Sequence, residues 1–377
     1  MHGNAKIYVA GHNGLVGSAI CRKLKEKGYE NLVARSRGEL DLTDQKRVID
    51  FFRQEKPEYV FLAAAKVGGI MANNIYRADF ILENLLIQTN IIHQSYLSGV
   101  KKLLFLGSTC VYPRDCPQPM KEEYLLTSPL EYTNEPYAIA KIAGLKMCES
   151  FNLQYGANYI CVMPTNLYGP GDNFDLETAH VLPAILRKMH LGKCLGQDDR
   201  TALRADLNKR PIGGVDGTAS DETVLRVLNA HGITLSGDKQ RAAGAPIPVT
   251  LTLWGTGRPM REFLWSGDMA DACVFIMENT NFSDLAGGLK EVRNTHINIG
   301  SGEEISIRDL ALAVKKATGF NGALVFDPSK PDGTPRKLTD VSRLRQLGWN
   351  HKASLDQGIK MLYEWYLKNA NNGNLTP

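Results

Sequence analysis

The sequence predicts an α/β fold, in which a Rossmann-type, doubly wound parallel sheet is followed by a smaller C-terminal α/β domain that binds the substrate. Short apolar runs alternate with helical patterns over the first 165 residues, and a glycine-rich turn follows the first run. The pattern then changes after the Gly169-Pro170-Gly171 turn. Strands buried on both faces are nearly continuous in apolar residues, and their alternation with helices favours a parallel sheet.

The apolar runs and the helical periodicity predict the elements in order. We expect strands at residues 6–10, 31–34, 59–63, 103–106 and 159–163, with helices at 15–27, 80–96 and 136–155. Later strands are expected near 252–254, 296–299 and 324–326, and later helices at 178–191 and 307–317. These elements predict a nucleotide-binding domain at 1–168, to which segments around 255–300 return, a mainly substrate-binding domain at 169–370, and a disordered tail at 371–377.

Residues 197–250 stand apart from this pattern. They contain no Phe, Trp or Tyr, and they balance seven basic residues against seven acidic ones. Ser220 is expected to cap a short helix whose apolar face is formed by Val224, Leu225 and Leu228 and which ends at Gly232. We interpret the segment as a mobile insertion, either a lid or interface element near the substrate or a surface decoration.

Composition excludes several classes of protein. Hydrophobic residues make up 43% of the chain and charged residues 22%, and no apolar run approaches the length of a membrane span. A net charge of +4 gives no support for nucleic-acid binding. The seven cysteines have no zinc-ligand spacing, and the N-terminus has no signal-peptide pattern. We therefore expect a cytoplasmic protein without a metal site.

The turn Gly11-His12-Asn13-Gly14-Leu15-Val16-Gly17 lies between the first strand and the first helix. Its glycines allow a tight turn and a close backbone approach, and the helix N-terminus faces an anion, so this context predicts a dinucleotide site. The second strand ends in Arg35-Ser36-Arg37, whose guanidinium groups would pair with the 2′-phosphate of NADP. Asp41 and Leu42 are expected near the adenine.

A second group of residues predicts acid/base chemistry. Tyr137 and Lys141 are four residues apart on a predicted helix and therefore share a face. A nearby ammonium group is expected to lower the pKa of the tyrosine toward working pH. Ser108 follows the fourth strand, at the sheet edge where such folds bind ligands, and would hydrogen-bond the same substrate oxygen.

Five longer stretches carry a resemblance to a known family. They are residues 63–70 (AAAKVGGI), 134–144 (NEPYAIAKIAG), 163–170 (MPTNLYGP), 259–263 (PMREF) and 329–337 (SKPDGTPRK). With these stretches the chain resembles the extended short-chain dehydrogenase/reductases, and among them the family that epimerises and reduces GDP-4-keto-6-deoxy-D-mannose to GDP-L-fucose. The resemblance covers nearly the whole chain except the insertion, and it implies an NADPH-dependent, homodimeric enzyme paired through the helices at 80–96 and 136–155.

The resemblance also implies roles for individual residues. It makes Cys110 the base and His180 the acid of the epimerisations at C3 and C5, while Ser108 and Tyr137 hold the C4 oxygen. The glycine turn, Arg37, Asp41 and Leu42 are among the cofactor contacts that the resemblance implies. The others are Leu106, Gly107, Ser108, Thr109, Tyr137, Lys141, Pro164, Thr165, Asn166, Leu167 and His180. The implied GDP-sugar contacts are Lys188, Trp254, Arg261, Asp332 and Lys337.

The chain departs from the family at several positions. Asn13 replaces an arginine that some members place near the 2′-phosphate, and Lys188 replaces an arginine, which keeps the charge but loses the bidentate fork. Two other functions compete with the main reading. A related nucleotide-sugar epimerase or dehydratase is one alternative, although a dehydratase would want an Asp-Glu pair where this chain has Cys110-Val111. A non-catalytic dinucleotide sensor is the other.

Overall fold

The structure is a computed structural model of the chain that describes residues 1–236 and 247–371. The chain divides into two compact units. The first unit consists of residues 1–171, 262–303 and 337–353, and the second consists of residues 172–261, 304–336 and 354 onward. The chain therefore passes from one unit to the other five times. Because each unit is compact by itself, each is described separately below.

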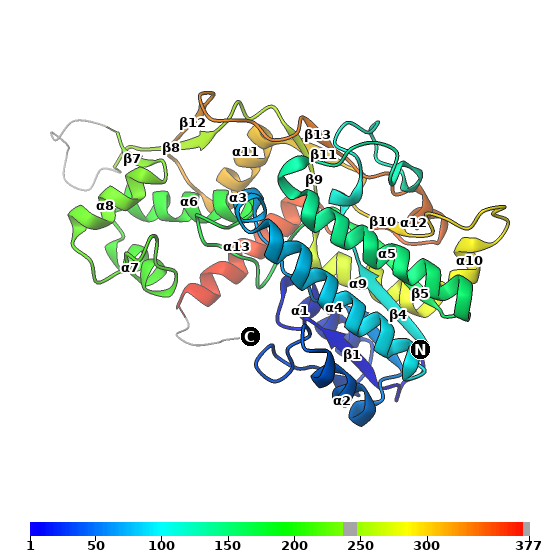
Figure 1. Cartoon of the computed structure of the whole chain (residues 1–377). Helices are drawn as coiled ribbons and strands as arrows, with labels where there is room; N and C mark the ends of the chain where they lie inside the picture. The colour runs from blue at the N-terminus through cyan, green and yellow to red at the C-terminus, as the bar shows by residue number, and fades with distance from the viewer. Residues whose placement is uncertain (237–246, 372–377) are drawn as a thin grey trace. The chain divides into compact units, whose positions relative to one another are not determined.

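The first unit is built on a six-stranded parallel sheet with the order β10-β5-β4-β3-β1-β2 (Figure 1). Its strands are β1 (Ile7–Ala10), β2 (Leu32–Val33), β3 (Tyr59–Leu62), β4 (Lys102–Leu106), β5 (Tyr159–Pro164) and β10 (Ile297–Ile299). The order reverses at β1, which pairs with β2 on one side and β3 on the other. This arrangement confirms the predicted Rossmann-type sheet and places a ligand crevice beyond the carboxyl ends of β1 and β3.

Helices cover both faces of this sheet. Successive residues of β3 alternate between two cores: Val60 and Leu62 belong to one hydrophobic cluster, and Phe61 belongs to the other. The first cluster packs α2, α4 and α5 on one face, and the second packs α1 and α9 on the other. The helices of this unit are α1 (Leu15–Glu26), α2 (Gln45–Glu55), α3 (Ile70–Ile75), α4 (Arg77–Leu97), α5 (Glu135–Tyr155), α9 (Ser266–Asn279), α10 (Phe282–Ala286) and α12 (Ser342–Gln346).

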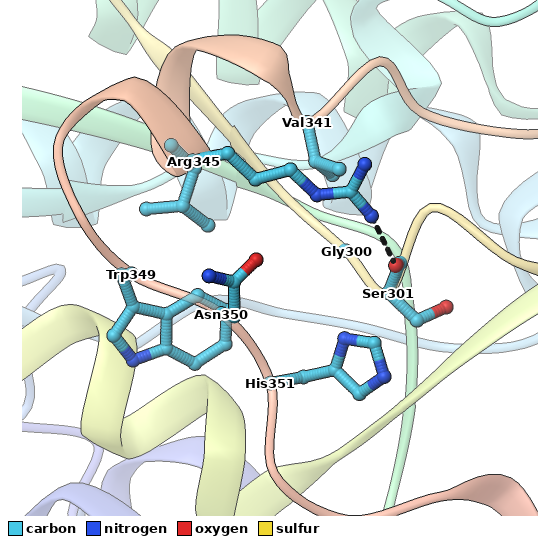
Figure 2. A pocket seen from close by; sticks show the side chains of 8 residues that line it. Gly300, Ser301, Val341, Arg345, Trp349, Asn350 and His351 are labelled. Carbon is cyan, nitrogen blue, oxygen red and sulfur yellow. Dashed lines mark hydrogen bonds between the residues drawn. The ribbon is translucent and has the colours of Figure 1, made fainter.

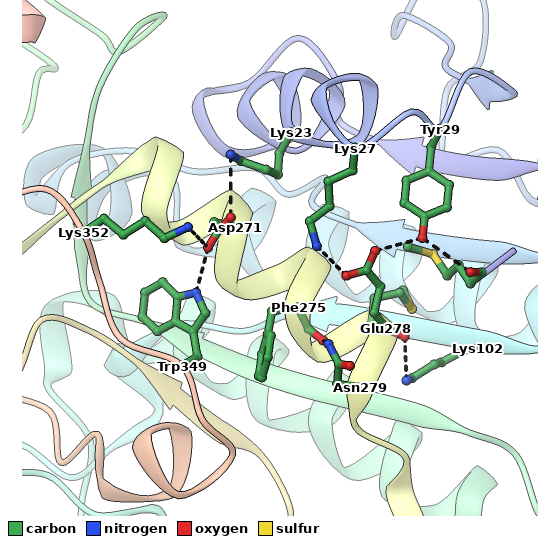
Figure 3. Close-up of polar contacts among 12 residues, drawn as sticks. Lys23, Lys27, Tyr29, Lys102, Asp271, Phe275, Glu278, Asn279, Trp349 and Lys352 are labelled. Atoms are coloured by element: carbon green, nitrogen blue, oxygen red, sulfur yellow. Dashed lines mark hydrogen bonds and ion pairs between the residues drawn. The ribbon is translucent and has the colours of Figure 1, made fainter. Parts of the chain in front are cut away.

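Polar contacts hold α9 in its place although it comes late in the chain (Figure 3). Its Glu278 carboxylate accepts hydrogen bonds from Lys27 and from the Tyr29 hydroxyl. The buried Lys102 ammonium on β4 donates to the carbonyls at the end of the helix, 2.7 Å from that of Met277. Burial lowers the pKa of Lys102 to about 8. These contacts tie a segment from residue 262 onward to the first strands and helices of the chain.

The second unit contains a three-stranded sheet, β12-β8-β7. β12 (Ala323–Asp327) runs parallel to β8 (Val249–Trp254), and β7 (Ile233–Leu235) runs antiparallel to it. The helices of this unit are α6 (Val181–Gly196), α7 (Arg200–Lys209), α8 (Asp221–Ala230), α11 (Ile307–Thr318) and α13 (Leu355–Asn371). The remaining strands of the chain are β6 (Asn166–Tyr168), β9 (Met260–Trp265), β11 (Glu304–Ser306) and β13 (Arg336–Lys337).

The described part of the segment at 197–250 is folded, with helices α7 and α8 and strand β7, and its mobility stays a prediction. Helix α8 is confirmed, with the Ser220 side chain accepting from the Thr223 amide. Helix α7 was not predicted; its Leu203 and Leu207 are buried, as are Val224 and Leu228 of α8. Residues 237–246 of this segment, and residues 372–377 of the predicted tail, lie outside the described residues.

Two buried carboxylates hold the points where the chain leaves the first unit. Glu262 directly follows the crossing between residues 261 and 262. Its carboxylate accepts hydrogen bonds from the backbone amides of Gly302, at 2.7 Å, and Thr339, at 2.9 Å, which lie near the crossings at 303/304 and 336/337. The Asp268 carboxylate accepts hydrogen bonds from the amides of Lys352 and Ala353, next to the crossing at 353/354. Glu262 and Asp268, which are six residues apart, therefore lie next to, or hydrogen-bond to chain next to, four of the five crossings.

The same stretches surround a small surface pocket (Figure 2). Its lining comes from the stretches at 262–303 and 337–353, namely Gly300, Ser301, Val341, Leu344, Arg345, Trp349, Asn350 and His351. Arg345 donates to the Ser301 carbonyl at 3.4 Å across the pocket. The Trp349 indole, seen from another side in Figure 3, donates to the Asp271 carboxylate, which also pairs with Lys352. The pocket is therefore enclosed by the segments that Glu262 and Asp268 hold.

Candidate active site

The glycine turn lies at the carboxyl end of β1, where the sheet order reverses. Gly11 has a φ of +84°, and a Cβ atom there would lie 2.7 Å from the Ala64 amide after β3. A Cβ atom on Gly17 would collide with the Gly11 carbonyl oxygen. Helix α1 follows at once, with Gly14 as its N-cap residue. The turn is therefore tight, and the free amides of the helix N-terminus follow it directly. A pyrophosphate site requires both features.

The two arginines after β2 differ in what they contact. Arg35 donates to the Glu55 carboxylate at 2.6 Å and lies over the Phe51 ring, so its guanidinium is already engaged. Arg37 keeps 75% of its side-chain surface exposed, and its contact with Glu83, at 3.5 Å, is long. Arg37 is therefore the better placed of the two to meet a 2′-phosphate.

The other predicted adenine contacts lie in the turn after Arg37. The Asp41 carboxylate accepts from the backbone amide and hydroxyl of Thr43, which lowers the pKa of Asp41. Leu42 packs partly against the core, and its carbonyl accepts from Asn90. Asp41 thus shapes its own turn, and its contact with adenine stays a prediction.

The remaining predicted cofactor contacts follow two neighbouring strands. Leu106 ends β4 beside Val162 of β5, and the Gly107 amide donates to the Val162 carbonyl at 2.8 Å. Pro164 ends β5, and the Thr165 amide donates to the Ile299 carbonyl of β10. The stretches at 106–109 and 164–167 therefore lie at the same edge of the sheet as the glycine turn.

Helix α5 carries Tyr137 and Lys141 on one face. The Lys141 ammonium is buried and donates to the Leu106 carbonyl at 2.8 Å. It lies 5.8 Å from the centre of the Tyr137 ring. Burial lowers the pKa of Lys141 to about 8.

The expected lowering of the Tyr137 pKa is wrong for this structure. Burial, reinforced by nearby Cys110, raises the pKa of Tyr137 above its usual range. The phenolate would be poorly solvated, and the Lys141 ammonium is turned toward the Leu106 carbonyl. Tyr137 therefore rests as a protonated phenol, which is the form needed to give a proton to a substrate oxygen.

Cys110 lies in a short 3₁₀ turn, Thr109–Val111, directly after Ser108. The Ser108 hydroxyl accepts from the Cys110 amide at 3.3 Å, and the thiol is buried with 7% of the residue exposed. Burial raises the pKa of the thiol, while Ser108, Lys337 and Lys141 act in the opposite direction. The first unit thus brings together Ser108, Cys110, Tyr137, Lys141 and Lys337.

His180 is the N-cap residue of α6 in the second unit, and the predicted helix start at 178 is wrong by three residues. The preceding turn is shaped by Asp175, whose carboxylate accepts from the amides of Glu177 and Thr178 and whose carbonyl accepts from that of Ala179. His180 keeps exposed surface, yet the protein around it removes enough water to lower the pKa of the imidazole. Desolvation therefore favours the neutral ring, as it favours the neutral thiol of Cys110.

Three predicted substrate contacts gather at another place in the second unit. Arg261 donates to the Thr334 carbonyl at 2.6 Å, beside Asp332, and burial lowers the pKa of Arg261. The Asp332 carboxylate accepts from the amide and hydroxyl of Thr256. Trp254, two residues earlier, is 68% exposed, and Lys330 lies over its ring. The exposed indole of Trp254 thus lies at the end of β8, and the guanidinium of Arg261 lies near the start of β9.

Lys188 lies apart from them on α6, eight residues after His180. It is partly buried, and burial lowers the pKa of its ammonium group.

Glu262 was missed by the sequence reasoning although it adjoins Arg261. Its residue is fully buried, and four donors from Ser301, Gly302 and Thr339 surround its two oxygens. The available signal was a single acidic residue at the start of an otherwise apolar run, Phe263–Trp265. A buried carboxylate needs several hydrogen-bond donors, and these come from residues 40 and 77 positions away, which the local sequence does not reveal.

Comparisons with known proteins agree with this geometry. Residues 7–219 and 233–300 match the NAD dependent epimerase/dehydratase family. The chain is 50% identical to GDP-L-fucose synthase 1 of Arabidopsis thaliana, over 98% of this chain and 95% of that protein. It is 46% identical to GDP-L-fucose synthase of Escherichia coli K12, over 97% of this chain and of that protein.

A solved structure resembles it equally closely. The GDP-D-glycero-L-gluco-heptose synthase of Campylobacter jejuni, determined in the presence of NADPH, is 45% identical, with a TM-score of 0.87. The match covers 97% of this chain and 99% of that one.

Proposed function

Because the chain belongs to the NAD-dependent epimerase/dehydratase family, we propose that it converts GDP-4-keto-6-deoxy-D-mannose to GDP-L-fucose. The enzyme inverts C3 and C5 of the sugar and then reduces C4. The observation that carries the proposal is the grouping of Ser108, Cys110, Tyr137 and Lys141 beside the carboxyl ends of β4 and β5.

The residues present fit NADP(H). Gly11 and Gly17 pack against backbone too closely to carry a side chain, which keeps the turn tight, and the N-terminus of α1 supplies amide donors for a pyrophosphate. The exposed Arg37 guanidinium suits the 2′-phosphate, and Asn13 of the glycine turn stands where some family members carry a second cation. Bound NADPH supplies the hydride for the reduction of C4.

Tyr137 and Ser108 act on the oxygen of C4. The protonated Tyr137 phenol and the Ser108 hydroxyl donate hydrogen bonds to that oxygen, which stabilises the enolate formed when a neighbouring carbon loses a proton. Tyr137 then gives its proton to the oxygen as C4 is reduced. Lys141, held by the Leu106 carbonyl with its ammonium 5.8 Å from the centre of the Tyr137 ring, contributes a positive charge near the phenolate left behind, an effect smaller than that of burial.

Cys110 and His180 move the protons at C3 and C5. The C4 carbonyl acidifies both positions, so each inversion needs one group that removes a proton and another that returns one to the opposite face. A thiol and an imidazole can both titrate under working conditions. We assign the base to Cys110 and the acid to His180 by resemblance.

The GDP moiety needs cations and a flat surface. The guanidinium of Arg261 and the ammonium groups of Lys188 and Lys337 suit the pyrophosphate. The exposed Trp254 offers an indole for packing. We assign Asp332 to this group because it lies beside Arg261, although its carboxylate is bonded to Thr256.

The function is tested by mixing the protein with NADPH and GDP-4-keto-6-deoxy-D-mannose and following nicotinamide absorbance. We expect substrate-dependent oxidation of NADPH and formation of GDP-L-fucose, with NADH a poorer donor. A folded protein that binds NADPH but oxidises it with neither this ketone nor a related one would contradict the proposal and favour a sensor.

A GDP-heptose ketone is a second candidate substrate. The observation that favours it is the similarity to the heptose synthase from C. jejuni at a TM-score of 0.87. Ser108, Tyr137 and Lys141 would serve the reduction of C4 equally well in either sugar. Comparing kcat/KM for the 6-deoxyhexose ketone and for a GDP-4-keto-heptose distinguishes the two, and the fucose assignment requires the hexose to be the better substrate.

We also propose that the protein is a homodimer paired through α4 and α5. The two helices pack together, with the Tyr96 and Tyr155 rings stacked 4.5 Å apart. Their outer faces keep large apolar side chains exposed, among them Leu82, Leu97 and Leu153, each more than half exposed. Light scattering after chromatography tests this, and Leu82→Asp with Leu153→Asp should yield monomers.

We place this activity in the cytoplasm. All seven cysteines are free thiols, which suits a reducing compartment. No described helix is long and apolar enough to cross a membrane.

A further inference from the structure

The segment at 197–250 contributes a buried charge to the helix that carries His180. Asp206 lies on α7 and Arg187 on α6, and the exposed fraction of both side chains is zero. The Arg187 Nε donates to Asp206 Oδ1 at 3.0 Å, and the Nη2 lies at the same distance from that oxygen. The other carboxylate oxygen accepts from the Tyr366 hydroxyl of α13. Asp206 therefore joins α6, which directly precedes the segment in the sequence, to α13, which lies near the end of the chain.

Arg187 uses its other donors on the chain around it. Its Nη1 donates to the Phe174 carbonyl at 3.1 Å, and its Nη2 donates to the Arg210 carbonyl just after α7. The Arg210 guanidinium in turn lies 4.5 Å from the centre of the Tyr366 ring and 5.4 Å from that of Phe174. The guanidinium of Arg187 thus joins the loop before α6, α6 itself and α7.

His180 lies between the two ends of this link. It follows Phe174 by six residues and precedes Arg187 by seven, at the junction of the loop and α6. The hydrogen bond from Arg187 to the Phe174 carbonyl therefore closes a short loop of chain that contains His180. A shift of Arg187 changes the angle at which that loop meets α6 and moves the imidazole.

The position of Arg187 depends on Asp206. A buried guanidinium without its carboxylate is an uncompensated charge, which the protein relieves by admitting water or by moving the side chain. No second described carboxylate pairs with Arg187.

We propose that Asp206 is a positioning residue for the epimerisation, holding His180 in place through Arg187 and the Phe174 carbonyl. The inserted segment is then a brace for α6 rather than a lid. This inference rests on the proposed function for the role of His180, whereas the link from Asp206 to His180 is a property of the fold.

The experiment compares Asp206→Asn with Asp221→Asn. Asp221 lies in the same segment and also pairs with an arginine, Arg204, but that pair is exposed and does not involve α6. Proton transfer is measured as solvent deuterium entering C3 and C5 of the ketone. The C4 step is measured separately as oxidation of GDP-L-fucose by NADP⁺, which needs Tyr137 but not His180.

We expect Asp206→Asn to slow deuterium entry by about 10- to 100-fold, the effect of displacing a catalytic group by about an ångström. The kcat for GDP-L-fucose oxidation should stay within about threefold, and Asp221→Asn should change neither rate. Equal losses in both steps, or normal deuterium entry in a folded Asp206→Asn protein, would overturn the proposal.

A second variant covers the case in which Asp206→Asn does not fold. Replacing Arg187 by Met and Asp206 by Leu together removes both charges and keeps the volume apolar, a change that buried ion pairs often tolerate. The bond to the Phe174 carbonyl is lost, so deuterium entry should again be slow. Normal entry in this double variant would contradict the proposal.

A spectroscopic measurement separates this proposal from the proposed function. In a ¹H–¹⁵N spectrum of histidine rings, assigned with His180→Asn, the His180 signal should move or broaden in Asp206→Asn and stay in place in Asp221→Asn. An unmoved signal refutes the link even if the wild-type enzyme is active. A moved signal supports it even if the wild type acts on a different ketone.

Discussion

The two units position the side chains of the proposed site in different ways. In the first unit, Ser108 and Cys110 directly follow strand β4, and Lys141 of helix α5 donates to the Leu106 carbonyl at the end of that strand. In the second unit, His180 depends on a buried guanidinium and a carboxylate from α7. The first site is therefore placed by the sheet, whereas the second is placed by side chains from distant parts of the chain. The first should tolerate surface changes, and the second should be sensitive to single buried charges.

The largest expected effect tests the group placed by the sheet. Tyr137→Phe removes the proton donor to the C4 oxygen but keeps the ring, which contacts Phe80 edge to face. We expect NADPH oxidation to fall by roughly 10²- to 10⁴-fold, the usual contribution of a general acid, with little change in melting temperature. A loss of less than about tenfold would remove Tyr137 from the acid role.

The pH dependence of proton exchange tests both units together. The pKa of His180 is lowered and that of Cys110 is raised. The rate of deuterium entry falls below the pKa of His180 and above the pKa of Cys110, whichever of the two groups is the base. Both assignments require the pair to carry one dissociable proton in total. We expect a broad plateau in deuterium entry between these limits.

Cys110→Ser should sharpen this result. Serine does not titrate in this range, so the alkaline limb should vanish while the acid limb remains, and the rate should fall by about 10²-fold. An unchanged alkaline limb would show that another group sets it.

Gly17→Ala tests how closely the glycine turn is packed. The new Cβ would collide with the Gly11 carbonyl oxygen, so the turn must open. We expect weaker NADPH binding and a loss of about 1–3 kcal/mol in unfolding free energy. Gly28→Ala is a poor control because its φ is +82°, whereas Gly38 has open space and no such strain. Gly38→Ala should therefore leave both quantities nearly unchanged.

The smallest effect separates the two arginines after β2. Arg37→Ala should reduce the preference for NADPH over NADH by about tenfold, or about 1.4 kcal/mol. Arg35→Ala should leave the preference intact and lower stability by about 1 kcal/mol, because its partner is Glu55. Kd values for both cofactors and a urea titration measure the two effects, and the reverse pattern would exchange the roles of these residues.

Sequence reasoning succeeded where a local pattern determines the structure. The strands of the first sheet and the turn from Gly11 to Gly17 followed from apolar runs and glycine spacing, because period and backbone geometry are local properties. The cap at Ser220 was predictable for the same reason. The roles assigned to the site residues stay predictions.

Long-range contacts explain what the sequence did not show. The segment at 197–250 was predicted to be too poor in apolar residues to form a domain of its own, and aromatic rings from outside the segment, Phe174 and Tyr366, pack against its Arg210. The pKa of Tyr137 was misjudged because spacing along a helix reveals neither the burial that raises this pKa nor that Lys141 points to a carbonyl. Neither partner could be identified from composition or period.

The place of β10 beside β5 has a consequence for the growing polypeptide. Residues 172–261 separate these two stretches of the first unit, so a nascent chain that ends before residue 297 leaves β5 as an unpaired sheet edge. Such edges invite pairing with other chains until they are covered. A ribosome that stalls within the second unit would therefore release an aggregation-prone fragment. The first 171 residues alone should likewise behave as an incomplete domain that needs residues 262–303 supplied in trans.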